Sequence, residues 1–455
     1  MRSTSRRTVD MLHGPIFKPM VLFAVPLLIS NIFQQFYNLA DTMIVANYLG
    51  DKALAAIGAT TAIYDLLVGF AIGIGGGLSV VTARSYGAGD RDLIKKSVAY
   101  SLIIGAAVSL LVTLAAQLFL YPLLEILNTP AEIIELAYAY ISSITLFTIV
   151  TFAYNLLAGL LRAIGNSVMP LVFLIFASLV NIALDILFIT RFSMGIAGAA
   201  YATVISQGLS AVLCAVYLWK KAPLLIPQKQ HFRFDKVLYG EMLGQGLSMG
   251  FMHSIVSAGT VILQYGINGF GTLIIAGHTT ARKLYTFFVM PFGSLAQAVS
   301  TFVSQNRGAC QRDRIRKALK YAYIADFVMA GVISAFLLVF AEPLVKLVSG
   351  SGEQELISNA TMYLHVVGPF YAVLGTLLNT RNALQGIGSK LLPLISSFTE
   401  MLVKFLFVVL LIPHFGYMAV VFCEPIIWTI MAGQMLIALY TNKYMRSGRR
   451  LAVSG

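Results

Sequence analysis

Apolar stretches recur along the whole chain, and short polar or turn-forming clusters separate them. Each stretch reaches the length of about 20 residues that an α-helix needs to cross a bilayer. Breaking the chain at the polar clusters predicts helices at residues 16–47, 53–85, 93–120, 132–161, 170–190, 194–219, 238–269, 273–305, 314–348, 357–386, 391–412 and 416–442. The composition agrees, because 11% of the residues are charged, against about 25% in soluble domains. We therefore predict an all-α integral membrane protein with twelve transmembrane helices.

Lysine and arginine residues gather in alternate connections between these helices. They occupy the amino terminus, the even-numbered connections and the carboxyl tail, whereas the opposite set holds only Lys52, Arg191 and Lys346. Because basic connections stay on the cytoplasmic side, we expect both termini to be cytoplasmic in a multi-pass protein of the inner or plasma membrane. The net charge of +13 then reflects topology. No nucleic-acid partner is expected, since the basic residues do not share one polar face.

Cysteine spacing and catalytic motifs give no support for an enzyme. Cys214, Cys310 and Cys423 lack the spacing of a zinc site, a redox pair or a disulfide framework. The chain has no His-x-x-x-His pair and no Gly-x-x-x-x-Gly-Lys loop for ATP. We therefore expect no catalytic residues and no cofactor.

An internal repeat divides the chain into two halves. The residues Gly87, Ala88, Arg91, Asp92, Ile94 and Lys96 recur as Gly308, Ala309, Arg312, Asp313, Ile315 and Lys317. Because each copy holds six spans, both copies keep the same orientation, which indicates a pseudo-twofold axis along the membrane normal. We expect an amino-terminal six-helix lobe at residues 1–219, a cytoplasmic linker at 220–237, and a carboxyl-terminal six-helix lobe with its tail at 238–455. Such paired repeats are typical of transporters that work by alternating access.

A small set of polar residues falls at membrane depth in the first half. The first span carries Gln34, Tyr37, Asn38 and Asp41 at spacings that place them on one helical face. In the fifth and sixth spans lie Asn181, Asp185 and Thr203. At 1.5 Å per residue, the two aspartates and the threonine lie roughly 9 to 14 Å below the outer ends of their helices. We expect them to meet at one depth.

The chemistry of this cluster allows more than one interpretation. Its carboxylate, amide and hydroxyl oxygens suit Na⁺, and two carboxylates in one apolar site are equally able to hold a proton. Apart from this Na⁺ at Asp41 and Asp185, no metal is expected. A third interpretation is a polar plug that fastens helices together. Charged groups cost several kcal/mol in hydrocarbon, so a functional role is favoured.

At these residues the chain resembles the multidrug and toxic compound extrusion (MATE) transporters. The resemblance covers essentially the whole chain and rests on Gln34-x-x-Tyr37-Asn38-x-x-Asp41, Leu49-Gly50, the segment 53–58 and the repeated Gly-Ala motif. In one branch of the family, acidic residues of the amino-terminal lobe carry the coupling. The resemblance assigns that cation-coupling site to Asp41, Tyr140, Asn155, Asn181, Asp185 and Thr203, with Tyr138 and Tyr154 as rivals of Tyr140. A carboxyl-lobe sodium site of another branch is not expected, because 246–257 and 368–379 contain no acid.

Further charged residues lie in the second half. Glu400 and Lys404 are four residues apart, and we expect Lys404 to pair with Glu424, Glu400 or both, since an isolated buried ammonium is too costly. A packing role and a substrate or coupling role are equally open. Other substrate-cleft candidates are His253 in the seventh span and the first-span residues Gln34, Tyr37 and Asn38.

Two more charged positions are interpreted from their place in the chain. Asp326 near the cytoplasmic end of its span is expected to pair with Lys320. Arg282 follows the repeat motif in the eighth span, and a place at the cleft mouth and a snorkelling role at the interface are equally open.

The resemblance implies an antiporter that exports organic, usually cationic, drugs or metabolites in exchange for H⁺ or Na⁺. We expect a functional monomer in the lipid bilayer with a small organic substrate. The alternative is a lipid-linked oligosaccharide flippase of the same superfamily, which would need more basic residues in its cleft to meet a pyrophosphate. A channel is disfavoured by the two unequal lobes.

Overall fold

The computed structural model describes residues 8–127 and 129–446, and within these ranges the chain is helical with no strand. The first half forms α1 (Phe17–Leu49), α2 (Asp51–Ala88), α3 (Arg91–Ile126), α4 (Ile134–Leu146), α5 (Thr148–Ala163), α6 (Val168–Ile186), η1 (Leu187–Arg191) and α7 (Gly195–Lys221). The connection forms η2 (Pro223–Leu225) and η3 (Lys229–Phe232). The second half forms α8 (Lys236–Ile267), α9 (Thr272–Gly308), α10 (Arg312–Ser349), α11 (Gln354–Val367), η4 (Gly368–Phe370), α12 (Tyr371–Gly386), α13 (Leu391–Leu406), η5 (Phe407–Leu411), α14 (Ile412–Phe415), α15 (Tyr417–Thr441) and α16 (Lys443–Arg446).

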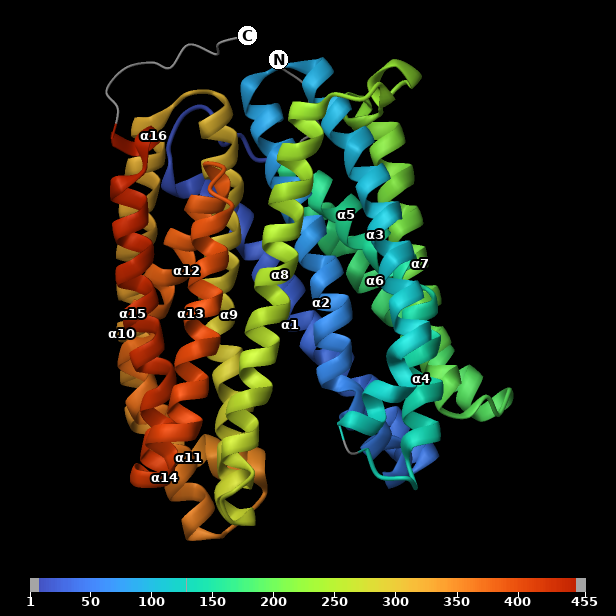
Figure 1. The fold of residues 1–455 in the computed structure, drawn as a ribbon, viewed down its shortest axis with the longest axis vertical. Coiled ribbons are helices and arrows are strands. Elements are labelled where there is room, and N and C mark those ends of the chain that lie inside the picture. The colour runs from blue at the N-terminus through green and yellow to red at the C-terminus, as the bar shows by residue number, and fades with distance from the viewer. Residues whose placement is uncertain (1–7, 128, 447–455) are drawn as a thin grey trace. The chain divides into compact units, whose positions relative to one another are not determined.

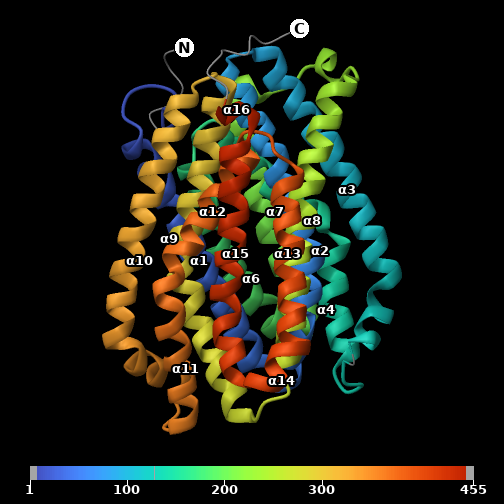
Figure 2. The same ribbon diagram turned by 60° about the vertical axis from the view of Figure 1, so that its left-hand side comes forward.

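The predicted all-helical membrane fold is confirmed. Eleven helices of the described residues are long and apolar enough to cross a membrane, and the pair α4 and α5 raises the number to twelve when it is counted as one span. This pair is bent by 50° at Phe147, so the predicted straight helix at 132–161 is broken. Figures 1 and 2 show the long helices within each half of the chain.

The chain divides into two compact units, each of which takes most of one half. Unit 1 comprises 1–10 and 25–254, and unit 2 comprises 11–24 and 255–455. Helices α1 and α8 therefore each contribute to both units. The lobes predicted from sequence follow chain order alone and place 11–24 and 238–254 differently. In α1 the change of unit comes just before Pro26, where the helix lacks one backbone hydrogen bond.

Glycines allow α2 and α8 to approach closely inside unit 1. A Cβ atom on Gly73 would lie 2.6 Å from the Met249 carbonyl oxygen, and one on Gly77 would lie 2.5 Å from that of Gln245. On the facing helix, a Cβ on Gly250 would meet Ile74 at 2.8 Å. Small residues four apart are the usual means by which membrane helices pack without a hydrophobic driving force. The glycines at 246 and 250 thus belong to a closely packed stretch of α8.

The connection between the repeats is ordered against unit 1. The Tyr100 hydroxyl donates to the Arg233 carbonyl oxygen (2.5 Å) and accepts from the Asp235 backbone N–H (2.7 Å). The buried His231 ring lies 3.3 Å from Asp92. These contacts fix η3 and the start of α8 on α3, whereas the sequence predicted only a polar linker.

The amino-terminal segment 11–14 is held by unit 2. Arg314 donates to the carbonyl oxygens of Met11 (3.2 Å) and Gly14 (2.8 Å), and Asn306 donates to Met11 (3.0 Å). Arg314 also donates to the Asn306 side chain at 3.0 Å. The basic segment after α9 therefore has a structural task, which is to hold the residues before α1.

Candidate functional site

Unit 1 contains a polar cavity of about 410 Å³ between α1, α2, α4, α5, α6 and α7. Its lining includes most of the predicted site and cleft residues, namely Gln34, Tyr37, Asn38, Asp41, Tyr140, Asn155 and Thr203, together with Tyr64, Asp65, Thr151, Tyr154 and Gln207. The four residues of α1 face the cavity together, as their spacing predicted. Asp41 and Asp65 are its charged lining residues, so every charge on the described lining is negative.

The centre of the site is a pair of carboxyl groups on different helices. Asp41 of α1 is 9% exposed and Asp185 of α6 is fully buried. The two groups lie close enough to share a hydrogen bond when one of them carries a proton. Asp41 Oδ1 and both Asp185 oxygens otherwise lack a partner, and among the described residues no cationic side chain pairs with them. Because unpaired buried carboxylates are costly, this pair favours binding of a proton or a cation.

Asn181 adds a second unsatisfied group beside the pair. It is fully buried one turn before Asp185, and neither its Oδ1 nor its Nδ2 has a hydrogen-bond partner. Neither Asn181 nor Asp185 lines the open cavity, so they lie behind Asp41 rather than on the wall.

A π-helical turn begins two residues after Asp185, directly at the end of α6. η1 spans Leu187–Arg191, and the repeated half carries η5 at the corresponding place, Phe407–Leu411. Such turns are rare and concentrate at functional sites. Neither turn was predicted, because no residue pattern in the two segments distinguishes a π-helix from an α-helix.

Hydrogen bonds connect the helices around the cavity. The Tyr37 and Thr203 hydroxyl oxygens lie 3.3 Å apart and join α1 to α7. Thr151 donates to Gln207 Oε1 at 2.5 Å and joins α5 to α7. Gln207 was not predicted from the sequence, although its place four residues after Thr203 puts both on one face of α7.

Two of the three tyrosine candidates of the fourth span, Tyr140 and Tyr154, lie on the cavity. Tyr140 is 9% exposed, lines the cavity and lies near both Asp41 and Asp185. Tyr154 lines the same cavity. Tyr138 instead packs edge-on against Tyr121, with ring centroids 5.5 Å apart. Asn155 lines the cavity, but its amide donates to the Thr151 carbonyl oxygen of its own helix at 2.9 Å.

Unit 2 contains an ion-paired network of buried and half-buried side chains. Arg282 lies 2.7 Å from Glu424, and the Tyr363 hydroxyl donates to the other Glu424 oxygen at 2.9 Å. Arg282 also stacks over the Tyr285 ring at 4.4 Å. From the sequence, Arg282 was expected at the cleft mouth or at the interface. The structure gives it a buried carboxylate partner.

A second network lies between α12 and α13. Lys404 donates to Glu400 at 2.9 Å, and Arg381 lies 3.9 Å from the same carboxylate. Lys404 therefore pairs with Glu400. No ion pair between Lys404 and Glu424 is found in the described part of the chain. His253, on the unit 1 part of α8, packs against the Gly73 position of α2 rather than on the cavity wall.

Asp326 differs from its sequence-based interpretation. It is fully buried in α10, and Asn379 of α12 donates to its Oδ2 at 2.6 Å. Its Oδ1 has no partner. The expectation that it serves as a partner of Lys320 was wrong, because the side chain faces α12 and not the helix end.

Among the described residues, no three His, Cys, Asp or Glu side chains come together as a metal site. The candidate ligands for a monovalent cation are therefore the side-chain oxygens of Asp41, Asp185, Asn181, Tyr37 and Thr203.

Comparison with known proteins identifies the family. The MatE family model matches residues 26–187 and 249–410, one stretch in each half. This chain belongs to the MatE family. The double match agrees with the internal repeat read from the sequence. MATE proteins are membrane transporters and not enzymes, so the chain is a multi-pass transporter.

Curated relatives are similar over most of their length. The chain is 28% identical to the probable multidrug resistance protein YoeA of Bacillus subtilis, covering 84% of each chain. It is 23% identical to the probable multidrug resistance protein NorM of Thermotoga maritima, covering 84% of this chain and 82% of the other.

Solved structures share the fold. A crystal structure of MATE in the bent conformation matches with a TM-score of 0.87 at 24% identity, covering 96% of this chain and 97% of the other. A transporter of Pyrococcus furiosus, described as having a binding pocket of reverse polarity, matches with a TM-score of 0.83 at 23% identity, covering 96% and 98%.

Proposed function

We propose that this MATE protein is an antiporter that exports small organic cations in exchange for H⁺ or Na⁺. The observation that carries the proposal is the pair Asp41 and Asp185, whose buried oxygens lack partners beside an open polar cavity. A cavity whose charged lining is entirely acidic attracts cations. The relatives named as multidrug resistance proteins support drugs or metabolites as the substrate class.

The geometry suggests how one ion affects the substrate. Binding of a proton or Na⁺ at the pair changes the charge of the wall that faces the substrate, and Asp41 lies one turn from Tyr37, whose hydroxyl contacts α7. Repacking or bending of α1 follows, with Pro26 as the point where the helix lacks a backbone hydrogen bond. The substrate is then released as the transporter changes between its two accessible states.

The basic connections support an orientation in the inner or plasma membrane with both termini cytoplasmic. Because the proposed site is complete within unit 1 of one chain, we propose a monomer as the functional unit. The flippase alternative is disfavoured, since the described cavity lining offers no basic side chain to a pyrophosphate.

Transport in proteoliposomes tests the proposal. Efflux of a fluorescent cationic dye is measured under an imposed pH gradient, an imposed Na⁺ gradient or neither, for the intact protein, Asp41→Asn and Asp313→Asn. Asp313 is an exposed acid of unit 2 and serves as the matched control for loss of one carboxylate.

We expect one gradient to drive efflux in the intact protein and the control but not in Asp41→Asn. Gradient-driven efflux that persists in Asp41→Asn would refute coupling at the pair. No gradient-driven movement of any dye by the folded protein would favour the flippase, and lipid-linked oligosaccharides would then be assayed.

A further inference from the structure

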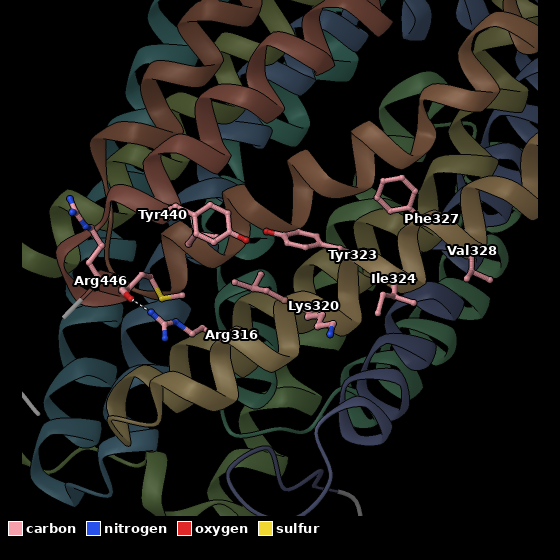
Figure 3. A pocket seen from close by; sticks show the side chains of 11 residues that line it. Arg316, Lys320, Tyr323, Ile324, Phe327, Val328, Tyr440 and Arg446 are labelled. Atoms are coloured by element: carbon pink, nitrogen blue, oxygen red, sulfur yellow. Dashed lines mark hydrogen bonds between the residues drawn. The ribbon is translucent and has the colours of Figure 1, made fainter. Parts of the chain in front are cut away.

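A groove of about 840 Å³ lies on unit 2, far from the candidate site in the chain, where α10, α15 and α16 meet (Figure 3). Its basic side chains are Arg316, Lys320 and Arg446. The rest of the lining is apolar or aromatic, namely Leu319, Tyr323, Ile324, Phe327, Val328, Leu439, Tyr440 and Met445. The groove thus has a cationic end and an apolar end along α10.

The three cations lack acidic counterparts in the groove. No Asp or Glu is among its lining residues. Arg316 and Lys320 are one helical turn apart, a spacing at which like charges repel. Arg316 donates to the Met445 carbonyl oxygen at 2.5 Å, which fixes it beside α16, and its nearest acid, Asp313, is exposed and 4.0 Å away. An anion in the groove would relieve this repulsion.

The apolar end has the exposure of a lipid-facing surface. Phe327 is 63% exposed, Val328 61% and Ile324 50%, on a helix that qualifies as a membrane span. Tyr323 and Tyr440 lie between this end and the cations, with their hydroxyls turned toward each other (Figure 3). Tyrosines at that level mark the boundary between hydrocarbon and headgroups.

We propose that this groove binds an anionic phospholipid of the cytoplasmic leaflet. Its phosphate lies at the cationic end beside Arg316, with Lys320 and Arg446 flanking it along α10 and α16 (Figure 3), and an acyl chain follows Ile324, Phe327 and Val328. Basic pockets between membrane helices on the cytoplasmic side are suited to such headgroups. The proposal relies on the orientation proposed above, in which this end of α10 is cytoplasmic. The tail at 447–455 is a poor rival occupant, because it carries Arg449 and Arg450, which repel the groove.

Quenching of a tryptophan in the groove by brominated lipid tests this proposal. The substitution Phe327→Trp is placed in the full-length chain after both native tryptophans, Trp219 and Trp428, are changed to Phe. The protein is reconstituted with mixtures of brominated phosphatidylglycerol and unlabelled phosphatidylcholine, or the reverse. Leu347→Trp, at the other end of α10 and 79% exposed, is the positional control.

Two double substitutions test the part played by charge. Lys320→Gln with Arg446→Gln removes two groove cations. Lys220→Gln with Lys221→Gln removes two exposed cations of unit 1 as the charge-matched control.

We expect the Phe327→Trp protein to show a preference for phosphatidylglycerol of at least about fivefold, since each basic side chain near a membrane surface contributes about fivefold to binding of anionic lipid. The preference should fall several-fold when Lys320→Gln and Arg446→Gln are added, leaving the contribution of Arg316, and it should persist in the charge-matched control. It should be absent in the Leu347→Trp protein.

Equal quenching by both lipids in the Phe327→Trp protein, or a loss of preference in the charge-matched control, would overturn the site. So would an increase in quenching after deletion of 447–455, because the tail would then be the occupant. Dye export, measured separately, does not affect this result, so failure of the lipid site and failure of the antiporter are distinguishable.

Discussion

The hydroxyl oxygens of Tyr37 and Thr203 lie 3.3 Å apart and form a direct polar contact between α1 and α7 at the cavity. The contact is four residues from Asp41, so a change of charge on the carboxyl pair reaches it within one helical turn. It therefore offers a way to separate ion binding from the movement of α1.

Tyr37→Phe removes this contact and keeps the ring. A neutral hydrogen bond contributes about 1 kcal/mol, so we expect a small loss of stability and a several-fold loss of gradient-driven dye efflux. Efflux and thermal unfolding are measured together in Tyr37→Phe and in Tyr48→Phe, whose ring is 56% exposed. Unchanged efflux in Tyr37→Phe would show that the contact has no part in transport.

Asp65 gives a test of substrate charge that leaves the coupling pair intact. It is exposed on the cavity wall. Among the described residues, no hydrogen bond joins it to Asp41 or Asp185. A single charge contact in a solvated cavity contributes about 1 kcal/mol, so Asp65→Asn should weaken binding of a cationic dye about fivefold. Binding of a neutral dye should be unchanged. Dye fluorescence titrations measure both, and equal weakening for both dyes would argue against recognition of the positive charge.

The first-span site could be predicted because a helix repeats every 3.6 residues. That period alone places Gln34, Tyr37, Asn38 and Asp41 on one face, and the cavity confirms it. To predict that Asp41 meets Asp185, the depth of each residue below the outer end of its helix had to be estimated. The estimate was possible because turn residues mark both helix ends, near Gly50 and near Arg191. The bend at Phe147 could not be predicted in the same way. The sequence is apolar both in α4 before it and in α5 after it, so no polar cluster marks the break.

Contacts in unit 2 were harder to predict because they depend on the rotation of neighbouring helices. Arg282 meets Glu424 across 142 residues of sequence, and nothing in either helix alone specifies that pairing. Asp326 was placed too near a helix end. α10 begins at Arg312, which puts Asp326 roughly 21 Å along the helix. Asp326 therefore lies roughly 9 Å further along α10 than Lys320, and its side chain bonds to Asn379 of α12.

Breaking the Arg282–Glu424 pair should destabilise unit 2. Glu424 is 6% exposed, and removal of one partner of a buried pair costs about 3 kcal/mol. Glu424→Gln should therefore lower the thermal unfolding temperature of the detergent-solubilised protein by several degrees. Glu424→Gln combined with Arg282→Met should recover much of the loss, because no unpaired charge remains. A double variant less stable than Glu424→Gln would show that the pair is not the source of the cost.

The contact between Asp326 of α10 and Gly375 of α12 has a counterpart in unit 1 between α3 and α5. There the glycine is on the first helix of the pair and the large side chain is on the second. A Cβ on Gly375 would lie 2.5 Å from the Asp326 carboxyl carbon, whereas in unit 1 it is Gly105 of α3 that accommodates Phe152 of α5. Each pair thus consists of one glycine and one large side chain. Adding a methyl group at such a contact forces the helices apart.

Gly375→Ala should accordingly cost about 1 to 3 kcal/mol in stability, the usual penalty for overpacking. Gly331→Ala on α10 is the matched control, because nothing lies within 4 Å of its Cβ position, and it should be neutral or stabilising by up to about 1 kcal/mol. Thermal unfolding of both variants measures the difference. Combining Gly375→Ala with Asp326→Ala should restore part of the loss, since it removes the carboxyl group that the new methyl meets. If the two substitutions add without recovery, Asp326 does not pack on Gly375, and the hydrogen bond from Asn379 must hold the carboxylate elsewhere.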